Sequence, residues 1–320
     1  SATRSPPRCS SGPAGDSTPG WFQYRGPNRD GKSTETGLVR SWDSTGPREE
    51  WRVPIGAGFS PISIVGDRLF TMDSDEKTEF ALCLDVQSGK TVWRVPMGPL
   101  FKDSNGDGPR SGPTVDGDRV YVLGSRGRLA ALDKASGEVV WQLEYEESFG
   151  SELPTWGFSA APLADGDLLI MEVGGSGSRA VAALDKATGE VRWTAQEGTI
   201  VYSSPILLEL GGIRQFVFLL QQKLVALNRE GKEIWSAPFA PEGTIKPAMP
   251  LFIAPDKIMV AASYDIGAKV VRLGTHGGTL KAEELWSSRY MRNHFNTSIA
   301  LDGHIYGFDA ATLRCLDAET

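Results

Sequence analysis

The sequence predicts an all-β fold, a β-propeller built from four-stranded antiparallel blades. Two observations support this prediction. The pattern Leu-Asp-x-x-Ser/Thr-Gly-x-x-x-Trp recurs along the chain, and a proline-started strand followed by a Gly-Asp turn recurs in phase with it. A repeat of about 40 to 50 residues that encodes several short strands is typical of propeller blades.

The tryptophan pattern sets the period of the repeat. It occurs at residues 84–93, 132–141 and 184–193, and in a form one residue shorter at residues 227–235. The tryptophans in register are Trp51, Trp93, Trp141, Trp193, Trp235 and Trp286, with spacings of 42, 48, 52, 42 and 51 residues. Since the pattern begins again at Leu316, we expect about five to six blades in this chain.

The repeated turn explains its own residue types. An aspartate such as Asp133 can accept backbone N–H groups inside the turn, and the glycine that follows supplies a positive φ. The tryptophan is large enough to dock on the neighbouring blade, where its indole N–H can donate to a carbonyl. Because a blade cannot bury both of its faces alone, we assign a structural role to the six tryptophans and to Gly89, Gly137 and Gly189.

The chain divides into a short leader and one β domain. Residues 1–20 are rich in Ser, Pro and Gly, and we expect them to be a disordered leader. Residues 21–320 are expected to form the propeller domain. Residues 316–320 start the turn motif without its glycine, so we expect the propeller to be C-terminally incomplete. No apolar run approaches the length of a transmembrane segment.

Composition argues against several kinds of partner. The formal net charge of −7 disfavours nucleic acid, because phosphate binding needs a basic face. The three histidines, at positions 276, 294 and 304, lack the spacing of a transition-metal site. Half of a calcium loop is present at Asp103, Asn105 and Asp107, but Thr114 stands where such a loop needs glutamate. The alternative there is a polar loop between blades.

Aligning the repeats identifies a candidate binding rim. The residues just before each inner strand should line one rim of the central channel, where a rigid scaffold commonly presents ligand-binding loops. These positions are occupied by Phe59, Arg110, Trp156, Phe158, Tyr202, Lys246, Arg292, Asn293 and His294. Their rings and cations suit a protein segment or a small anionic ligand. The alternative is that these side chains plug the channel and pair with neighbouring aspartates.

From Trp21 onwards the chain resembles the pyrroloquinoline-quinone-like β-propeller repeat family. Besides the repeats, the resemblance rests on residues 21–38 (WFQYRGPNRDGKSTETGL), 156–162 (WGFSAAP) and 289–308 (RYMRNHFNTSIALDGHIYGF). It implies an eight-bladed ring, of which two or more blades would be absent here. It also implies an extracytoplasmic location, either periplasmic or associated with the cell envelope.

The resemblance leaves two kinds of activity open. Quinoprotein dehydrogenases of this architecture bind pyrroloquinoline quinone with calcium, using an adjacent Cys-Cys pair, calcium ligands of Glu and Asn, and a catalytic Asp. In this chain Cys9, Cys83 and Cys315 are isolated, and no motif matches the calcium ligands or the base. The lipoprotein scaffold of the outer-membrane β-barrel insertion machinery shares the architecture and implies protein binding instead.

We therefore predict a non-catalytic binding or scaffolding module of the cell envelope. Its ligand would be a protein segment or a small anionic molecule at the rim, or an extended peptide added to an edge strand. The alternative is a quinone-dependent oxidoreductase acting on an alcohol or a sugar, with Arg110, Lys246 and Arg292 clamping carboxylates and no identified base. A carbohydrate-active enzyme is disfavoured, because the rim offers no paired carboxylates.

Overall fold

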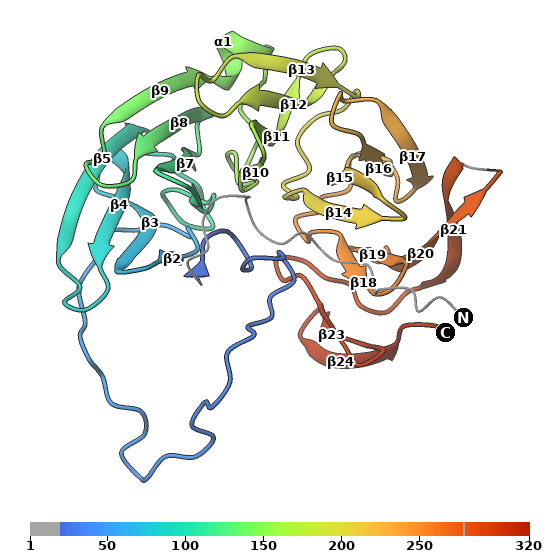
Figure 1. Cartoon of the computed structure of the whole chain (residues 1–320), viewed down its shortest axis with the longest axis horizontal. Coiled ribbons are helices and arrows are strands. Elements are labelled where there is room, and N and C mark those ends of the chain that lie inside the picture. The colour runs from blue at the N-terminus through green and yellow to red at the C-terminus, as the bar shows by residue number, and fades with distance from the viewer. Residues whose placement is uncertain (1–19, 278) are drawn as a thin grey trace.

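The computed structural model describes residues 20–277 and 279–320 and confirms the all-β fold. Six antiparallel sheets follow one another around a common axis, and the first and sixth are not paired with each other (Figure 1). In this part of the chain the only α-helix is α1 (Tyr145–Phe149), and no helix is long and apolar enough to cross a membrane. Residues 1–19 of the expected leader lie outside the described residues, and Gly20 begins β1.

Each blade runs from an inner strand at the axis to an outer strand at the periphery. Blade 1 contains β2 (Ser63–Val65), β3 (Arg68–Ser74), β4 (Thr78–Asp85) and β5 (Thr91–Pro99), and the short β1 (Gly20–Trp21) pairs with β2. Blade 2 contains β6 (Thr114–Asp116), β7 (Arg119–Leu123), β8 (Arg128–Asp133) and β9 (Val139–Glu144). Blade 3 contains β10 (Leu163–Asp165), β11 (Leu168–Gly175), β12 (Arg179–Asp185) and β13 (Val191–Ala195).

The remaining blades repeat this meander. Blade 4 contains β14 (Ile206–Leu210), β15 (Ile213–Leu219), β16 (Lys223–Leu227) and β17 (Glu233–Pro238). Blade 5 contains β18 (Leu251–Ile253), β19 (Lys257–Ala262), β20 (Gly267–His276) and β21 (Thr279–Ser288). Blade 6 has three described strands, β22 (Ile299–Leu301), β23 (His304–Asp309) and β24 (Thr312–Asp317). The predicted five to six blades are confirmed.

The predicted turn forms between the third and fourth strands of the first three blades. In blade 2 the Asp133 carboxylate accepts the N–H groups of Ala135 at 3.0 Å and Ser136 at 2.9 Å. Accepting these hydrogen bonds lowers the pKa of Asp133 below its ordinary value. Gly137 closes the turn at a φ of 77°, which glycine adopts without strain.

The turn glycine is also the surface against which the tryptophan ring of the preceding blade packs, and we call this contact the seat of the tryptophan. A Cβ added at Gly189 would lie 2.7 Å from the Trp141 ring, so only glycine leaves room for the indole. The Trp141 indole N–H then donates to the Lys186 carbonyl at 3.0 Å. Equivalent indole bonds to the next blade are Trp51 to Val86 (2.8 Å), Trp93 to Lys134 (3.1 Å), Trp193 to Arg229 (2.8 Å) and Trp286 to Ala318 (3.2 Å).

Trp235 is the exception, because blade 5 lacks the Asp-x-x-Ser/Thr-Gly turn. Its indole N–H donates within its own blade, to the side-chain oxygen of Gln215 at 2.6 Å. In place of the short turn, β20 and β21 form a long hairpin whose Leu273 and Leu280 join the same apolar cluster as Trp235. The junction between blades 4 and 5 is therefore closed mainly by apolar packing.

A second set of junctions surrounds the axis, at the start of the inner strands. Here Ser or Thr hydroxyls bond to the backbone of an adjacent blade. The pairs are Ser63 Oγ to Pro113 O (2.7 Å), Thr114 Oγ1 to Pro162 O (2.6 Å), Ala161 N to Ser204 Oγ (2.8 Å), Ser203 Oγ to Ala248 O (3.2 Å) and Met249 N to Thr297 Oγ1 (2.9 Å). Each pair of consecutive blades is thus tied near the axis.

The seat of the tryptophan can be tested with two glycines that share a positive φ. Gly117 has a φ of 57° with no atom within 4 Å of an added Cβ, whereas Gly189 has a φ of 78° and the Trp141 ring at 2.7 Å. We expect Gly117→Ala to lower the free energy of unfolding by about 1 kcal/mol through backbone strain alone. Gly189→Ala should lower it by about 3 kcal/mol, because the ring must also move. Urea unfolding followed by tryptophan fluorescence measures both, and equal losses would contradict the proposed seat.

Candidate functional site

The propeller has two faces, which differ in the connections that they carry. The turn face carries the Asp-x-x-Ser/Thr-Gly turns, and Lys134 N–H bonds there to Asp118 O of the adjoining turn at 2.9 Å. The loop face carries the loops between blades and the turns between second and third strands, joined for example by Phe158 N–H to Ser125 O at 2.8 Å. All the predicted rim residues lie in connections of the loop face.

Three of the predicted rim residues do not present their side chains at the surface. Phe158 is buried edge-on against Tyr145, with 5.1 Å between ring centroids. Lys246 is 0% exposed. Asn293 is buried, donates to Phe308 O at 2.9 Å and accepts from Ser298 Oγ at 2.9 Å. All three lie in loops of the loop face, and their side chains contact other residues of the protein.

Arg110 is committed to its own loop. Its guanidinium donates to the carbonyls of Gly106, at 2.7 Å, and Gly108, and lies 3.9 Å from the Asp103 carboxylate. This is the loop that contains the calcium candidates Asp103, Asn105 and Asp107. A guanidinium therefore already supplies positive charge to carbonyls that would otherwise be free to bind a cation.

Aromatic rings adjoin this guanidinium and extend over the next blades. The Arg110 Cζ lies 4.7 Å from the Phe101 ring centroid and 5.5 Å from that of Phe59, which is 57% exposed. Trp156 and Tyr202 meet edge to face, with centroids 5.6 Å apart, and a Cβ added at the neighbouring Gly157 would lie 3.5 Å from the Phe101 ring. We call Phe59, Phe101, Arg110, Trp156 and Tyr202 the first rim cluster.

Two buried carboxylates hold the backbone of this cluster in place. Glu79 accepts the N–H of Phe101 at 3.3 Å and of Ser125 at 2.8 Å. Glu172 accepts the N–H of Val201, the residue before Tyr202, at 2.9 Å. Burial raises the pKa of both carboxyls, that of Glu172 to about 8.

Lys246 and Tyr145 complete the buried group around Glu172. Burial lowers the pKa of Lys246 to about 8, and its Nζ donates to Thr244 O at 2.8 Å. The second carboxyl oxygen of Glu172 and the hydroxyl of Tyr145 are both buried without a hydrogen-bond partner. Lys246, Tyr145 and Tyr202 are the ionisable groups that interact electrostatically with Glu172.

A second rim cluster consists of Tyr264, His294 and Phe295. His294 stacks on Phe295 with centroids 3.9 Å apart, and Tyr264 meets His294 edge to face at 5.3 Å. Tyr264 is 64% exposed and Phe295 is 71% exposed. Burial lowers the pKa of His294, which favours the neutral imidazole at pH 7. The cluster is therefore an uncharged aromatic platform open to solvent.

Arg292, next to this platform, is paired with aspartates. Its Nε lies 2.6 Å from the Asp309 carboxylate, and its guanidinium lies 3.6 Å from that of Asp265. The Arg292 guanidinium holds the pKa of Asp309 at about 2. This pairing matches the structural alternative considered for the rim.

The repeat pattern alone does not identify Phe101, Tyr264, Phe295 or the two buried glutamates, Glu79 and Glu172. Tyr264 lies in the turn between β19 and β20, and only loops that precede inner strands were compared. The signal in the sequence is a bulky Tyr next to Asp in so short a turn. In the structure both residues take a positive φ there, 54° and 66°.

Backbone strain is concentrated on the loop face. Of ten described non-glycine residues with positive φ, seven belong to it: Gln196, Tyr202, Ala240, Tyr264, Asp265, Met291 and Ala310. Arg25 and Arg29 lie in the N-terminal segment, which leaves Asp302 for the turn face. Each such residue costs about 1 kcal/mol where glycine would cost little.

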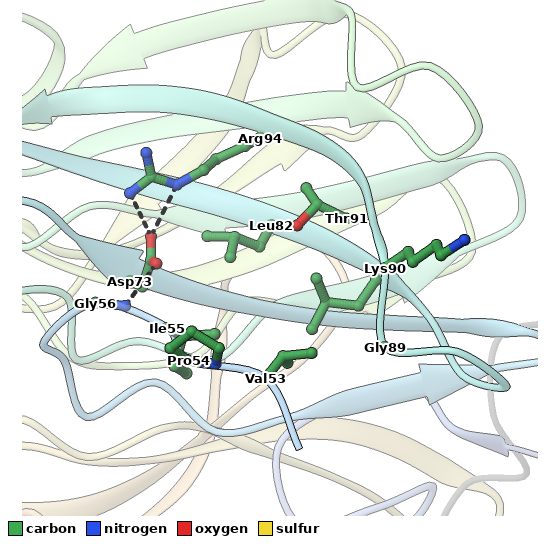
Figure 2. A pocket seen from close by; sticks show the side chains of 11 residues that line it. Val53, Pro54, Ile55, Gly56, Asp73, Leu82, Gly89, Lys90, Thr91 and Arg94 are labelled. Carbon is green, nitrogen blue, oxygen red and sulfur yellow. Dashed lines mark hydrogen bonds and ion pairs between the residues drawn. The ribbon is translucent and has the colours of Figure 1, made fainter. Parts of the chain in front are cut away.

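A cavity of about 480 Å³, none of whose lining residues belongs to a rim cluster, lies between residues 53–56 and the strands β4 and β5 (Figure 2). Leu82 and Leu84 contribute to its apolar lining, and the Asp73–Arg94 ion pair lies beside Gly56. In blade 2 the corresponding residues of β8, Ala130 and Leu132, pack against blade 1. The cavity is therefore a groove on a blade face of the kind that packs against another sheet.

Comparison with known proteins relates this geometry to one family. A family model described as outer membrane protein assembly factor BamB matches residues 77–320. The outer membrane protein assembly factor BamB of Pseudomonas aeruginosa is 31% identical over 152 residues, which are 44% of this chain and 36% of that protein. The match thus spans about a third of that relative's length.

Two solved structures share the fold. BamB from Moraxella catarrhalis aligns with a TM-score of 0.56 and 18% identity, over 79% of this chain and 68% of that one. A europium-containing methanol dehydrogenase aligns with a TM-score of 0.52 and 15% identity, over 81% of this chain and 66% of that one. These likenesses support the propeller architecture.

The buried carboxyl of Glu172 predicts an unusual pH dependence. Because the folded protein favours the protonated carboxyl up to about pH 8, Glu172 should make the free energy of unfolding fall as pH rises from about 4.5 to 8. The fall is at most about 1.4 kcal/mol per pH unit. The lowered pKa of Lys246 should reverse the slope above pH 8.

Glu172→Gln keeps an oxygen for the Val201 N–H and removes the titration. We expect urea unfolding of this variant to lose the downward slope between pH 5 and 8, while the exposed-site control Glu146→Gln retains it. If the free energy of unfolding varied with pH in the same way for the unmodified protein and Glu172→Gln, the raised pKa of Glu172 would be contradicted.

Proposed function

The chain belongs to the family of the outer membrane protein assembly factor BamB, and we propose that it is a non-catalytic scaffold of the cell envelope that binds a protein segment on its loop face. The membership confirms the resemblance to the pyrroloquinoline-quinone-like repeats. The envelope location and the protein partner are proposals supported by the family's description.

The observation that carries this proposal is the strained, exposed tyrosine at position 264. Glycine would adopt its φ of 54° without strain, and a polar side chain would suit its 64% exposure better. A large ring retained under both penalties is explained if the ring binds something. Exposed aromatic side chains on a rigid support are typical anchors of protein interfaces.

The charges of the rim favour a polypeptide over a small anionic ligand. Arg110 donates to carbonyls of its own loop, Arg292 pairs with two aspartates, and Lys246 is 0% exposed. An anion clamp needs a cation whose donors can reach the ligand. The rings of Phe59, Tyr264 and Phe295 remain exposed, and they suit apolar side chains of a polypeptide.

The same residues do not fit pyrroloquinoline quinone with calcium. The three cations considered as carboxylate clamps are committed or buried, as described above. We therefore propose no quinone chemistry for this chain.

A photo-crosslinking experiment tests the proposed surface. Benzoylphenylalanine replaces Phe59, Phe295, Ala135 of the turn face, or Val139 of the outer strand β9, in the full chain. The probe is a purified outer-membrane β-barrel protein diluted from urea. We expect adducts from positions 59 and 295 and none from position 135. Adducts only from position 139 would indicate capture by an edge strand, and equal labelling of all positions would contradict a specific surface.

Tyr264→Gly should separate stability from binding. The substitution relieves the positive φ but loses the ring, so the free energy of unfolding should rise by up to about 1 kcal/mol. Binding of the same probe should weaken about tenfold, because the anchor is lost. Ala310→Gly is the matched control, since Ala310 is exposed at a φ of 53° and has no ring. Equal effects of the two variants on binding would exclude Tyr264 as an anchor.

A further inference from the structure

A segment near the N-terminus crosses the axis of the propeller. Residues 20–32, which we call the strap, begin in β1 beside blade 1 and continue across the centre of the molecule, drawn in blue in Figure 1. The Phe22 carbonyl accepts the N–H of Val115 in blade 2 at 2.8 Å. Tyr24 packs against the apolar cluster of blades 4 and 5.

Arg29 joins the strap to blades 3 and 4. Its side chain donates to the carbonyls of Ala161 at 3.3 Å, Pro205 at 3.0 Å and Pro162, and to the side-chain oxygen of Gln23 at 2.8 Å. Arg29 is 3% exposed, and burial lowers its pKa to about 9. Its partners are oxygens of uncharged groups, and the planar guanidinium donates to several backbone carbonyls at once.

Arg25 joins the strap to blade 6. Its guanidinium donates to the carbonyls of Thr297 at 3.0 Å and Ser298 at 2.8 Å, and also to Asp30 O within the strap at 3.1 Å. Arg25 and Arg29 both have positive φ, 64° and 54°. Both anchoring residues are therefore held in a strained conformation by the fold of the strap.

The carbonyls that these arginines bind belong to the loops that carry the two rim clusters. Ala161 and Pro162 end the loop that contains Trp156, and Pro205 is three residues beyond Tyr202. Thr297 and Ser298 come two and three residues after Phe295. Arg29 thus holds the backbone next to the first rim cluster, and Arg25 holds the backbone next to the second.

We infer that the strap sets the distance between the two rim clusters, with Arg25 and Arg29 as positioning residues for a two-part binding surface. The tryptophan and hydroxyl junctions join only consecutive blades, so small displacements can add up between blade 3 and blade 6. Hydrogen bonds from one segment to blades 3, 4 and 6 across the axis limit this accumulated displacement directly. The positioning role stands on the contacts above, and only its consequence for binding rests on the proposed function.

Pulsed electron paramagnetic resonance between spin labels measures this distance without any partner. The labels are placed at Thr155 and Asn296, which are exposed beside the two clusters, in the full chain with Cys9 and Cys315 replaced by Ser. Arg25→Ala and Arg29→Ala should each give a distance distribution roughly twofold wider than the unmodified strap. Arg48→Ala is the control, because this arginine side chain is 83% exposed and lies outside the strap.

Unchanged distributions in both folded alanine variants would overturn the inference. If an alanine variant does not fold, Arg25→Lys and Arg29→Lys provide the same test, since they keep the charge but lose the forked donor. Binding of the urea-diluted outer-membrane protein is then measured for the same variants. A wider distribution with unchanged binding would leave the positioning role intact and contradict the two-part surface instead.

Discussion

The packing of a tryptophan against the turn glycine of the next blade, as Trp51, Trp93, Trp141 and Trp193 show, is the contact on which the rest of the structure depends. A four-stranded blade has two apolar faces, and each is buried only when a neighbour lies at the right distance. The indole fixes that distance at the periphery, as Trp141 does over Gly189, and the hydroxyl bonds fix it at the axis, as Thr114 does with Pro162. With both ends of a junction fixed, the loops between blades can vary in sequence without altering the architecture.

This dependence explains how much of the molecule could be predicted from the sequence. The junction uses local residues at a regular spacing, so the blades and their turns could be read directly. The environment of Trp235 could not be read in this way. Its acceptor Gln215 lies in another strand, and in blade 5 a long hairpin replaces the Asp-x-x-Ser/Thr-Gly turn. The rim residues lie on the loop face, but the sequence pattern could not show the ring of Phe158 against Tyr145 or Lys246 interacting with Glu172, because these partners come from other elements.

Both faces contain turns that require a positive φ, but they place different residue types at these positions. On the turn face, positive φ falls on glycines such as Gly89, Gly137 and Gly189, at little energetic cost. On the loop face, Tyr202 and Tyr264 occupy such conformations with large side chains attached. Strain of about 1 kcal/mol at each persists only where surrounding contacts hold the backbone, and beside Tyr202 the Glu172 carboxylate accepts the N–H of Val201. The turn face therefore avoids backbone strain, whereas the loop face carries strain at positions that hold large side chains such as Tyr264.

The strap follows from what the inner strands leave unsatisfied. Prolines precede most of these strands. Some carbonyls there accept a hydroxyl of an adjacent blade, as Pro113 and Pro162 do, whereas Ala161 and Pro205 accept from Arg29. A guanidinium carries five donors on a rigid plane, so Arg29 satisfies carbonyls of blades 3 and 4 at once. A lysine would satisfy fewer groups with less geometric definition. The same donors that remove a backbone penalty also join blades that share no junction with the strap's own blade 1, which is why a segment of thirteen residues can brace the centre of the propeller.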